Sequence, residues 1–180
     1  MSPPGASLID LLSADLTSYR REGAGASGER FVPSQGGPSF EVTQREERRF
    51  MGRTTIARFH TTHAGATAPG SLEVRHTGRR RRIGIEAVVI SGGPAMVAVA
   101  DSIAGDEALV SAALPLDFTL FELRSDGTEW RTEVELMGAT MVAIALPPMR
   151  SYVHLYPDQL EALSATLGEL GRVLAMTATG

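Results

Sequence analysis

Residues 116–136 read LDFTLFELRSDGTEWRTEVEL, and this pattern is typical of an antiparallel β-hairpin. Residues 116–123 and 130–136 are two strand-like runs, and every second side chain of the latter is suited to one face of a sheet. Between them lies Asp126-Gly127, and Asp-Gly between two alternating runs is a strong hairpin signal. The sequence therefore predicts two paired strands here.

The regions on both sides of this hairpin have a similar period of two. Between residues 40 and 90, Ala57 and Phe59 alternate with polar residues, and Ile83, Ile85, Ala87 and Val89 recur at every second position. Short turns such as Thr77-Gly78 separate such runs. Residues 40–90 and 141–146 are therefore predicted to add antiparallel strands to the same sheet.

Helical patterns lie at both ends of the chain. Residues 7–21 carry apolar side chains at helical spacing after Ser7, which is a suitable amino-terminal cap. From Pro157 onward, leucines recur at intervals of three and four residues and form one apolar stripe, which predicts a long amphipathic helix. These leucines are Leu160, Leu163, Leu167, Leu170 and Leu174. A sheet face is the only large surface available to cover that stripe.

A central helical segment is predicted from proline and glycine positions. Pro94 just inside a start and Gly105 just past an end indicate a helix at residues 94–104. A shorter helix is predicted at residues 106–113. The run at residues 96–100 is rich in valine and alanine, so it also suits a strand.

These patterns predict the fold class α+β: an antiparallel sheet with an N-terminal helix, a central helical segment and a C-terminal amphipathic helix packed on one face. The length of 180 residues suits a single domain over residues 1–180. Residues 23–37 are rich in glycine, alanine, serine and proline, so we expect a mobile loop there.

The composition excludes several classes of chemistry. The chain has 17 arginines and no lysine, asparagine or cysteine, and the absence of lysine throughout indicates the composition of a G+C-rich genome rather than one arginine site. Without cysteine, disulfides, thiolate zinc sites and cysteine nucleophiles are excluded.

The sequence also lacks a secretion signal, because Asp10 and Asp15 lie where a signal peptide would be uncharged. No apolar run approaches the ~20 residues of a membrane helix, so we expect a cytoplasmic protein with no membrane span.

Two patterns resemble catalytic or cofactor sites, but their surroundings argue against both. Residues 23–28 spell GAGASG, yet they follow a predicted helix, whereas a dinucleotide site needs a strand before its glycines and a helix after them. Glu133 and Glu135 share one strand face, which we interpret as a solvated face rather than an acid and base pair. The motifs of serine hydrolases, zinc proteases and phosphate loops do not occur.

The four histidines do not form a metal-binding pattern. His60 and His63 are three residues apart, so on a strand they point to opposite faces. No acidic residue follows them closely enough to complete a ligand set with His76 or His154. We therefore expect no metal or other cofactor and assign no catalytic residue. The sequence leaves open whether the protein is an enzyme and favours a non-enzymatic role.

Charge is divided unevenly along the chain. Residues 45–82 hold ten arginines against three glutamates, a net charge of +7, and residues 91–180 hold four arginines against twelve acids, a net charge of −8. Candidate contacts for an anion or a partner are Arg75, Arg79, Arg80, Arg81 and Arg82. We expect them to pair with acids of the same chain or of a second subunit, so a homo-oligomer joined through basic and acidic halves is one hypothesis. Nucleic acid is a weaker hypothesis, because only Phe50 and Phe59 in this window could stack on bases.

Three short segments of the second half carry a resemblance. They are ALPLDF at residues 113–118, Trp130 with Gly138-Ala139, and PPMRSY at residues 147–152. Together they resemble a family of uncharacterised bacterial proteins over residues 113–174. The resemblance implies a bacterial origin and brings no active-site motif. The order of helix, strands, helix, strands and helix is also similar to small secretion-chaperone and sensory-regulator folds, an analogy of architecture alone.

From these observations we expect a non-enzymatic bacterial binding or regulatory protein that presents a sheet and helix surface to a protein partner or a small apolar ligand. One alternative is a helix-on-sheet pocket protein, either a lipid or small-molecule carrier or an enzyme, with an internal cavity. The side chains that would line that cavity are Phe118, Leu120, Trp130, Val134, Val142 and Ile144. A second alternative is polyanion or nucleic-acid binding through the basic stretch from Arg45 to Arg82.

Overall fold

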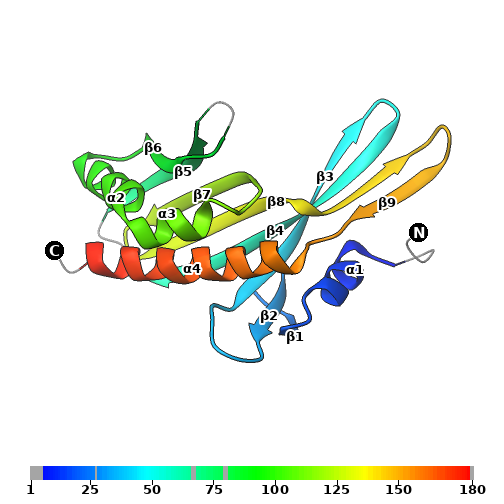
Figure 1. Cartoon of the computed structure of the whole chain (residues 1–180), viewed down its shortest axis with the longest axis horizontal. Coiled ribbons are helices and arrows are strands. Elements are labelled where there is room, and N and C mark those ends of the chain that lie inside the picture. Colours follow the sequence, from blue (N-terminus) through cyan, green and yellow to red (C-terminus); the bar gives the residue numbers. More distant parts are fainter. Residues whose placement is uncertain (1–5, 27, 66–67, 79–80, 179–180) are drawn as a thin grey trace.

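The structure is a computed structural model that describes residues 6–26, 28–65, 68–78 and 81–178. Within these residues the chain forms four helices and one nine-stranded antiparallel sheet (Figure 1). In chain order the elements are α1 (Leu8–Asp15), β1 (Tyr19–Ala24), β2 (Glu29–Pro33), β3 (Phe40–Arg49), β4 (Gly52–Ala64), β5 (Pro69–Thr77), β6 (Gly84–Ser91), α2 (Pro94–Gly105), α3 (Glu107–Ala113), β7 (Phe118–Asp126), β8 (Glu129–Ile144), β9 (Met149–Val153) and α4 (Pro157–Thr177).

The sheet is organised around β8, its longest strand. The strand order is β1-β2-β3-β4-β8-β7-β5-β6, and β9 also pairs with β8. The first half of β8 pairs with β7 and its second half with β9, while β4 runs along the other side of both halves. Between the two halves, residues 136–139 of β8 bulge opposite Ala57, and Ala139 takes a left-handed φ of 54°. The bulge therefore marks the point where β8 changes its neighbour from β7 to β9.

The predicted hairpin is the β7–β8 pair. Its turn is closed by Asp126, whose carboxylate accepts hydrogen bonds from the backbone N–H groups of Thr128 at 2.9 Å and Glu129 at 3.1 Å. These bonds lower the pKa of Asp126 to about 2. Gly127 has a φ of 97°, a conformation that glycine adopts without steric cost.

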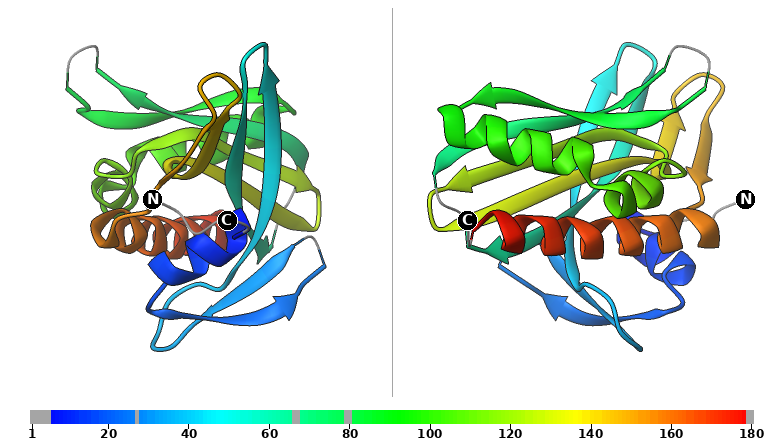
Figure 2. Two further views of the ribbon diagram at one scale, coloured as in Figure 1. Left: turned by 90° about the vertical axis from the view of Figure 1, so that its right-hand side faces the viewer. Right: turned by 60° about the vertical axis from the view of Figure 1, so that its left-hand side comes forward.

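One face of the sheet carries the core and is covered by the helices. A row of directly opposed residues, Val42, Phe59, Val134 and Phe121, is buried on that face. The leucine stripe of α4 is also buried, and Figure 2 shows α2, α3 and α4 on the same side of the strands. The α+β class, the antiparallel sheet and the packing of the helices on one face are thus confirmed.

The paired ends of β3, β4, β8 and β9 project beyond the helices (Figures 1 and 2). We call residues 45–56 and 140–153 the finger, and residues 50–51 and 145–149 its tip. The two hairpins stay paired up to their turns, because the backbone N–H of Ala145 donates to the carbonyl oxygen of Met51 at 3.0 Å. The finger is therefore a continuous four-stranded extension of the sheet.

Several predicted elements differ from the structure. The amino-terminal helix, predicted over residues 7–21, ends at Asp15. Tyr19 is instead the first residue of β1, and its ring centroid lies 4.7 Å from that of Phe40. Residues 23–37, expected to be a mobile loop, contain the end of β1 and all of β2, because Phe31 is buried in the core and β2 pairs with β3. The run at 130–136 and residues 141–144 of the next run belong to one strand, β8, and residues 145 and 146 lie in the turn that follows. The central segment is helical, as predicted, including residues 96–100.

Candidate functional site

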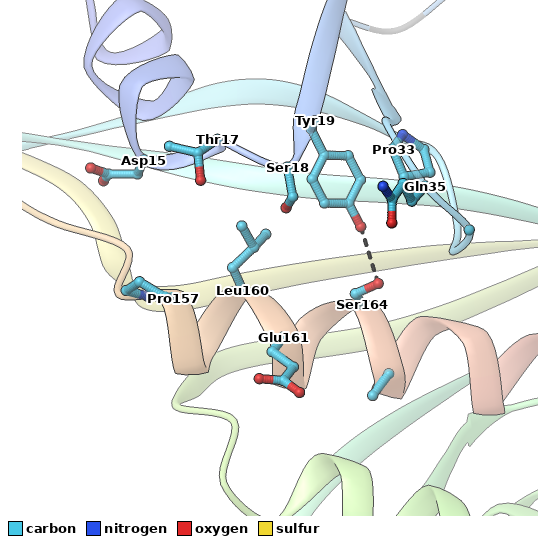
Figure 3. A pocket seen from close by; sticks show the side chains of 12 residues that line it. Asp15, Thr17, Ser18, Tyr19, Pro33, Gln35, Pro157, Leu160, Glu161 and Ser164 are labelled. Carbon is cyan, nitrogen blue, oxygen red and sulfur yellow. Dashed lines mark hydrogen bonds between the residues drawn. The ribbon is translucent and has the colours of Figure 1, made fainter.

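A hollow of about 410 Å³ lies between the end of α1, the β2–β3 connection and the first turns of α4 (Figure 3). Tyr19 reaches across it, and its hydroxyl lies 3.1 Å from Oγ of Ser164. Burial raises the pKa of Tyr19, so this hydroxyl stays protonated. Thr17 and Gln35 add polar groups to the lining, and Leu160 adds an apolar one. The lining thus combines hydroxyl and amide groups with apolar side chains.

Asp15, at the edge of this hollow, ties three segments together. Its Oδ2 accepts hydrogen bonds from the Tyr152 hydroxyl at 2.7 Å and from the backbone N–H of Leu155 at 2.9 Å. Its Oδ1 lies 2.9 Å from Nδ1 of His154. Burial and the neighbouring carboxylate raise the pKa of Tyr152 far above its usual range.

A carboxylate that orients an exposed imidazole is one half of a general-base arrangement. In the part of the chain that the structure describes, however, His154 has no hydrogen bond to a hydroxyl that could act as nucleophile. The residues present join the end of α1 to β9 and to the start of α4.

The uncovered face of the sheet is filled by arginine and glutamate side chains. Glu135 is only 4% exposed, and it accepts bonds from Nε and Nη2 of Arg45 at 2.8 and 3.1 Å and from Nε of Arg58 at 2.5 Å. Burial by itself raises the pKa of Glu135, but the bonds from Arg45 and Arg58 outweigh it and hold the pKa below its usual value. Arg58 also pairs with Glu133. The interpretation of Glu133 and Glu135 as a solvated face was thus wrong for Glu135, because arginines of β3 and β4 close over it.

A second hollow, of about 470 Å³, lies on this face beside His60. Nε2 of His60 is 2.8 Å from Oγ1 of Thr43, and burial lowers the pKa of His60.

The other histidines lie elsewhere. His63 points to the covered face, where its ring lies beside Gly171 of α4. His76 stacks on Phe118 with ring centroids 4.1 Å apart. Among residues 6–178 with their gaps, no three or more histidine, aspartate or glutamate side chains are arranged to hold a metal ion.

The predicted arginine contacts are divided between paired and exposed side chains. Arg75 pairs with Glu73 at 2.7 Å, and Arg82 pairs with Asp117. Arg81 is exposed, whereas Arg79 and Arg80 lie outside the described residues.

The six residues predicted to line one cavity lie on two faces. Phe118, Trp130 and Val134 are on the covered face, packed in or against the core. Leu120 is opposite Glu135, and Val142 and Ile144 are opposite Thr54 and Gly52 of β4, which places these three on the uncovered face. The six side chains therefore do not share one cavity.

Sequence reasoning missed the apolar tip of the finger. Phe50 is fully exposed, Leu146 is 73% exposed, and Met51 and Met149 are about half exposed. They lie together because the two turns are hydrogen-bonded side by side. The available signal was large apolar residues in two turns, where polar residues are usual. Contiguous exposed apolar side chains with polar surroundings mark interaction surfaces.

The fold and the tip together define an α+β protein with a helix-covered sheet and a projecting apolar end. The chain belongs to the family described as Protein of unknown function (DUF3156), whose sequence model matches residues 14–174. The resemblance to an uncharacterised family is thus confirmed and extends over most of the chain. No match was found among curated proteins or among solved structures. In the described residues, none of the helices combines the length and apolar character needed to cross a membrane.

Proposed function

We propose that this chain is a non-enzymatic binding protein that docks on its partner through the tip of the finger. One observation carries the proposal: Phe50, Met51, Leu146 and Met149 are all exposed, and they lie on two adjacent turns at the end of the finger. Burying an exposed side chain of this size stabilises a complex by about 1.5–3 kcal/mol. Burial of the four therefore contributes substantially toward the cost of association, which is about 4–15 kcal/mol.

The finger favours docking because its backbone is already ordered before a partner binds. The strands remain hydrogen-bonded from the helix-covered body up to Ala145 and Met51. Side chains held on a preordered backbone lose less conformational entropy on binding than those on a flexible loop. The tip is thus displayed in a form suited to binding.

The hollow in Figure 3 supports a second candidate function, the binding of a small polar molecule. Tyr19, Ser164, Thr17 and Gln35 offer hydrogen bonds from three segments of the chain. Retention of a small molecule by the protein in native mass spectrometry, and its loss in Tyr19→Phe, would favour this function. Nucleic-acid binding along the whole basic stretch is less favoured, because Arg45, Arg58, Arg75 and Arg82 already have acidic partners in the same chain.

Fractionation of extracts from the organism tests docking through the tip. The variant F50S/L146S removes two exposed apolar side chains without disturbing the core. The matched control is I83S/I90S, which changes two residues that are 73% and 58% exposed beside and within the edge strand β6, outside the finger. We expect wild type and control to sediment with a larger particle and F50S/L146S to sediment as the free chain. Identical sedimentation of all three would show that the proposal is wrong.

A further inference from the structure

Behind the apolar tip, one row of the sheet carries three arginines. Arg48 of β3 is directly opposite Arg53 of β4, Arg53 is opposite Ala143 of β8, and Ala143 is opposite Arg150 of β9. Directly opposed residues project from the same face, so the three guanidinium groups form a band across the finger. Like charges placed opposite each other destabilise a sheet. The row therefore favours an anionic partner.

The acids near this row neutralise only part of its charge. Glu46 lies 3.3 Å from Arg53 and 3.8 Å from Arg48, and one carboxylate cannot balance both. Arg150 instead contacts the sulfur of Met141 and the carbonyl oxygen of Ala6. The side chain of Arg48 is 81% exposed and its contact with Glu46 is long, so it can reach a phosphate by exchanging that exposed partner. The finger thus presents positive charge, although the whole chain has a net charge of −4.

We infer that the partner of the tip is the surface of an anionic phospholipid bilayer, an inference that rests on the proposed function. A strand rises about 3.3 Å per residue, so Arg48 and Arg53, each two residues from the nearest tip residue, lie about 7 Å behind it. Apolar groups at a membrane surface enter the boundary between headgroups and acyl chains by about 5–10 Å. With Phe50, Met51, Leu146 and Met149 inserted, the arginine row lies at the depth of the phosphates.

Shape and charge favour a bilayer over the other occupants. The tip is formed by two hairpin turns that project from the body (Figure 1), and a bilayer accepts such an end without a preformed groove. A second copy docking tip to tip would bring two rows of arginines together, which like-charge repulsion opposes. Arginine forms paired hydrogen bonds with phosphate oxygens, so Arg48 and Arg53 suit a surface rich in phosphates. A protein with an acidic groove remains an outcome of the test.

The test uses the absence of cysteine from the chain. The variant F50C then carries one thiol, which is labelled with the polarity-sensitive fluorophore NBD and mixed with vesicles. Vesicles of phosphatidylcholine alone are compared with vesicles that also contain phosphatidylglycerol. The matched control carries the same label at I90C, an exposed apolar position outside the finger. Circular dichroism verifies that each labelled chain is folded.

We expect a blue shift and brighter emission at position 50 with the anionic vesicles, binding at least tenfold weaker with phosphatidylcholine alone, and no change at position 90. Each arginine near an anionic surface contributes about 1 kcal/mol, so R53Q in the F50C background is expected to bind about fivefold more weakly. Added salt should weaken binding as well, because it screens the phosphates.

Three results would overturn the inference. They are no response at position 50, equal responses to neutral and anionic vesicles, and equal responses at positions 50 and 90. If position 50 does not respond but F50S/L146S still changes sedimentation in extracts, the tip docks on a protein and the proposed function stands. If neither measurement responds to the tip, both the inference and the proposed function are wrong.

Discussion

Glu135 is the side chain whose environment departs most from that of an ordinary surface acid. Its carboxylate is buried on the uncovered face and shared by Arg45 and Arg58, each only partly exposed. Without Glu135, Arg45 and Arg58 keep only Glu47 and Glu133 as acidic partners. The loss of a buried charge that two partly buried guanidinium groups share costs more than a surface ion pair contributes. The stability of the sheet centre therefore depends on this acid more than on any exposed pair around it.

The substitution Glu135→Gln is expected to lower the free energy of unfolding by about 2–3 kcal/mol, because it removes the negative charge that compensates two guanidinium groups. Urea unfolding followed by circular dichroism measures the change. The matched control is Glu129→Gln, which breaks the exposed pair with Arg131 and is expected to cost about 0.5 kcal/mol or less. Equal losses in both variants would contradict the account of Glu135.

The lowered pKa of Glu135 also predicts a pH dependence. A carboxyl group whose pKa is lower in the folded state than the ordinary 4.5 stabilises the fold above that pH, and the contribution is lost as the pH falls through the folded value. Below pH 4.5, wild type should therefore lose stability more steeply than Glu135→Gln, which has no proton to bind there. Unfolding curves at a series of pH values measure this, and parallel curves would count against it.

Among the elements, the finger depends on the close approach of β4 and β8. A Cβ atom built at Gly52 would lie 2.6 Å from the carbonyl oxygen of Ala143, and this oxygen belongs to the backbone and cannot swing away. Gly52→Ala is therefore expected to force the two strands apart and to cost about 1–3 kcal/mol.

Urea unfolding, with hydrogen exchange of the finger amides, measures the effect of Gly52→Ala. The matched control is Gly105→Ala at the end of α2, where an added Cβ meets no atom within 4 Å. This substitution should leave the free energy of unfolding unchanged or raise it slightly. If Gly52→Ala leaves the free energy of unfolding unchanged, β4 and β8 are not in close contact at Gly52.

The elements that sequence reasoning predicted are those with a local signal. Pro94 and Gly105 mark the two ends of α2, and the leucine spacing after Pro157 defines α4. Each pattern lies entirely within its own helix, so it can be recognised from a short stretch of sequence. The strand β2 was missed because its glycine-rich surroundings conceal the long-range burial of Phe31. The apolar tip was missed for a related reason. The exposure of Phe50 depends on where a second hairpin, almost a hundred residues later, ends beside it.

Taken whole, the molecule brings its basic and acidic halves together within one chain. Arg45 and Arg58 reach Glu135 across the sheet, and Arg82 reaches Asp117. Charge-driven self-association between the two halves is therefore not expected. Size-exclusion chromatography with light scattering should give the same mass at low and high salt. A larger mass at low salt that falls as salt is added would contradict this assignment of the ion pairs.

Docking through the finger is the central claim, and a photoreactive phenylalanine analogue at position 50 tests it most directly. The same analogue at position 90 is the control, because both side chains are exposed but only position 50 belongs to the tip. After irradiation in living cells of the organism, we predict covalent adducts to lipid or protein at position 50 and none above background at position 90. Equal labelling at the two positions, or no adduct at position 50, would contradict the claim.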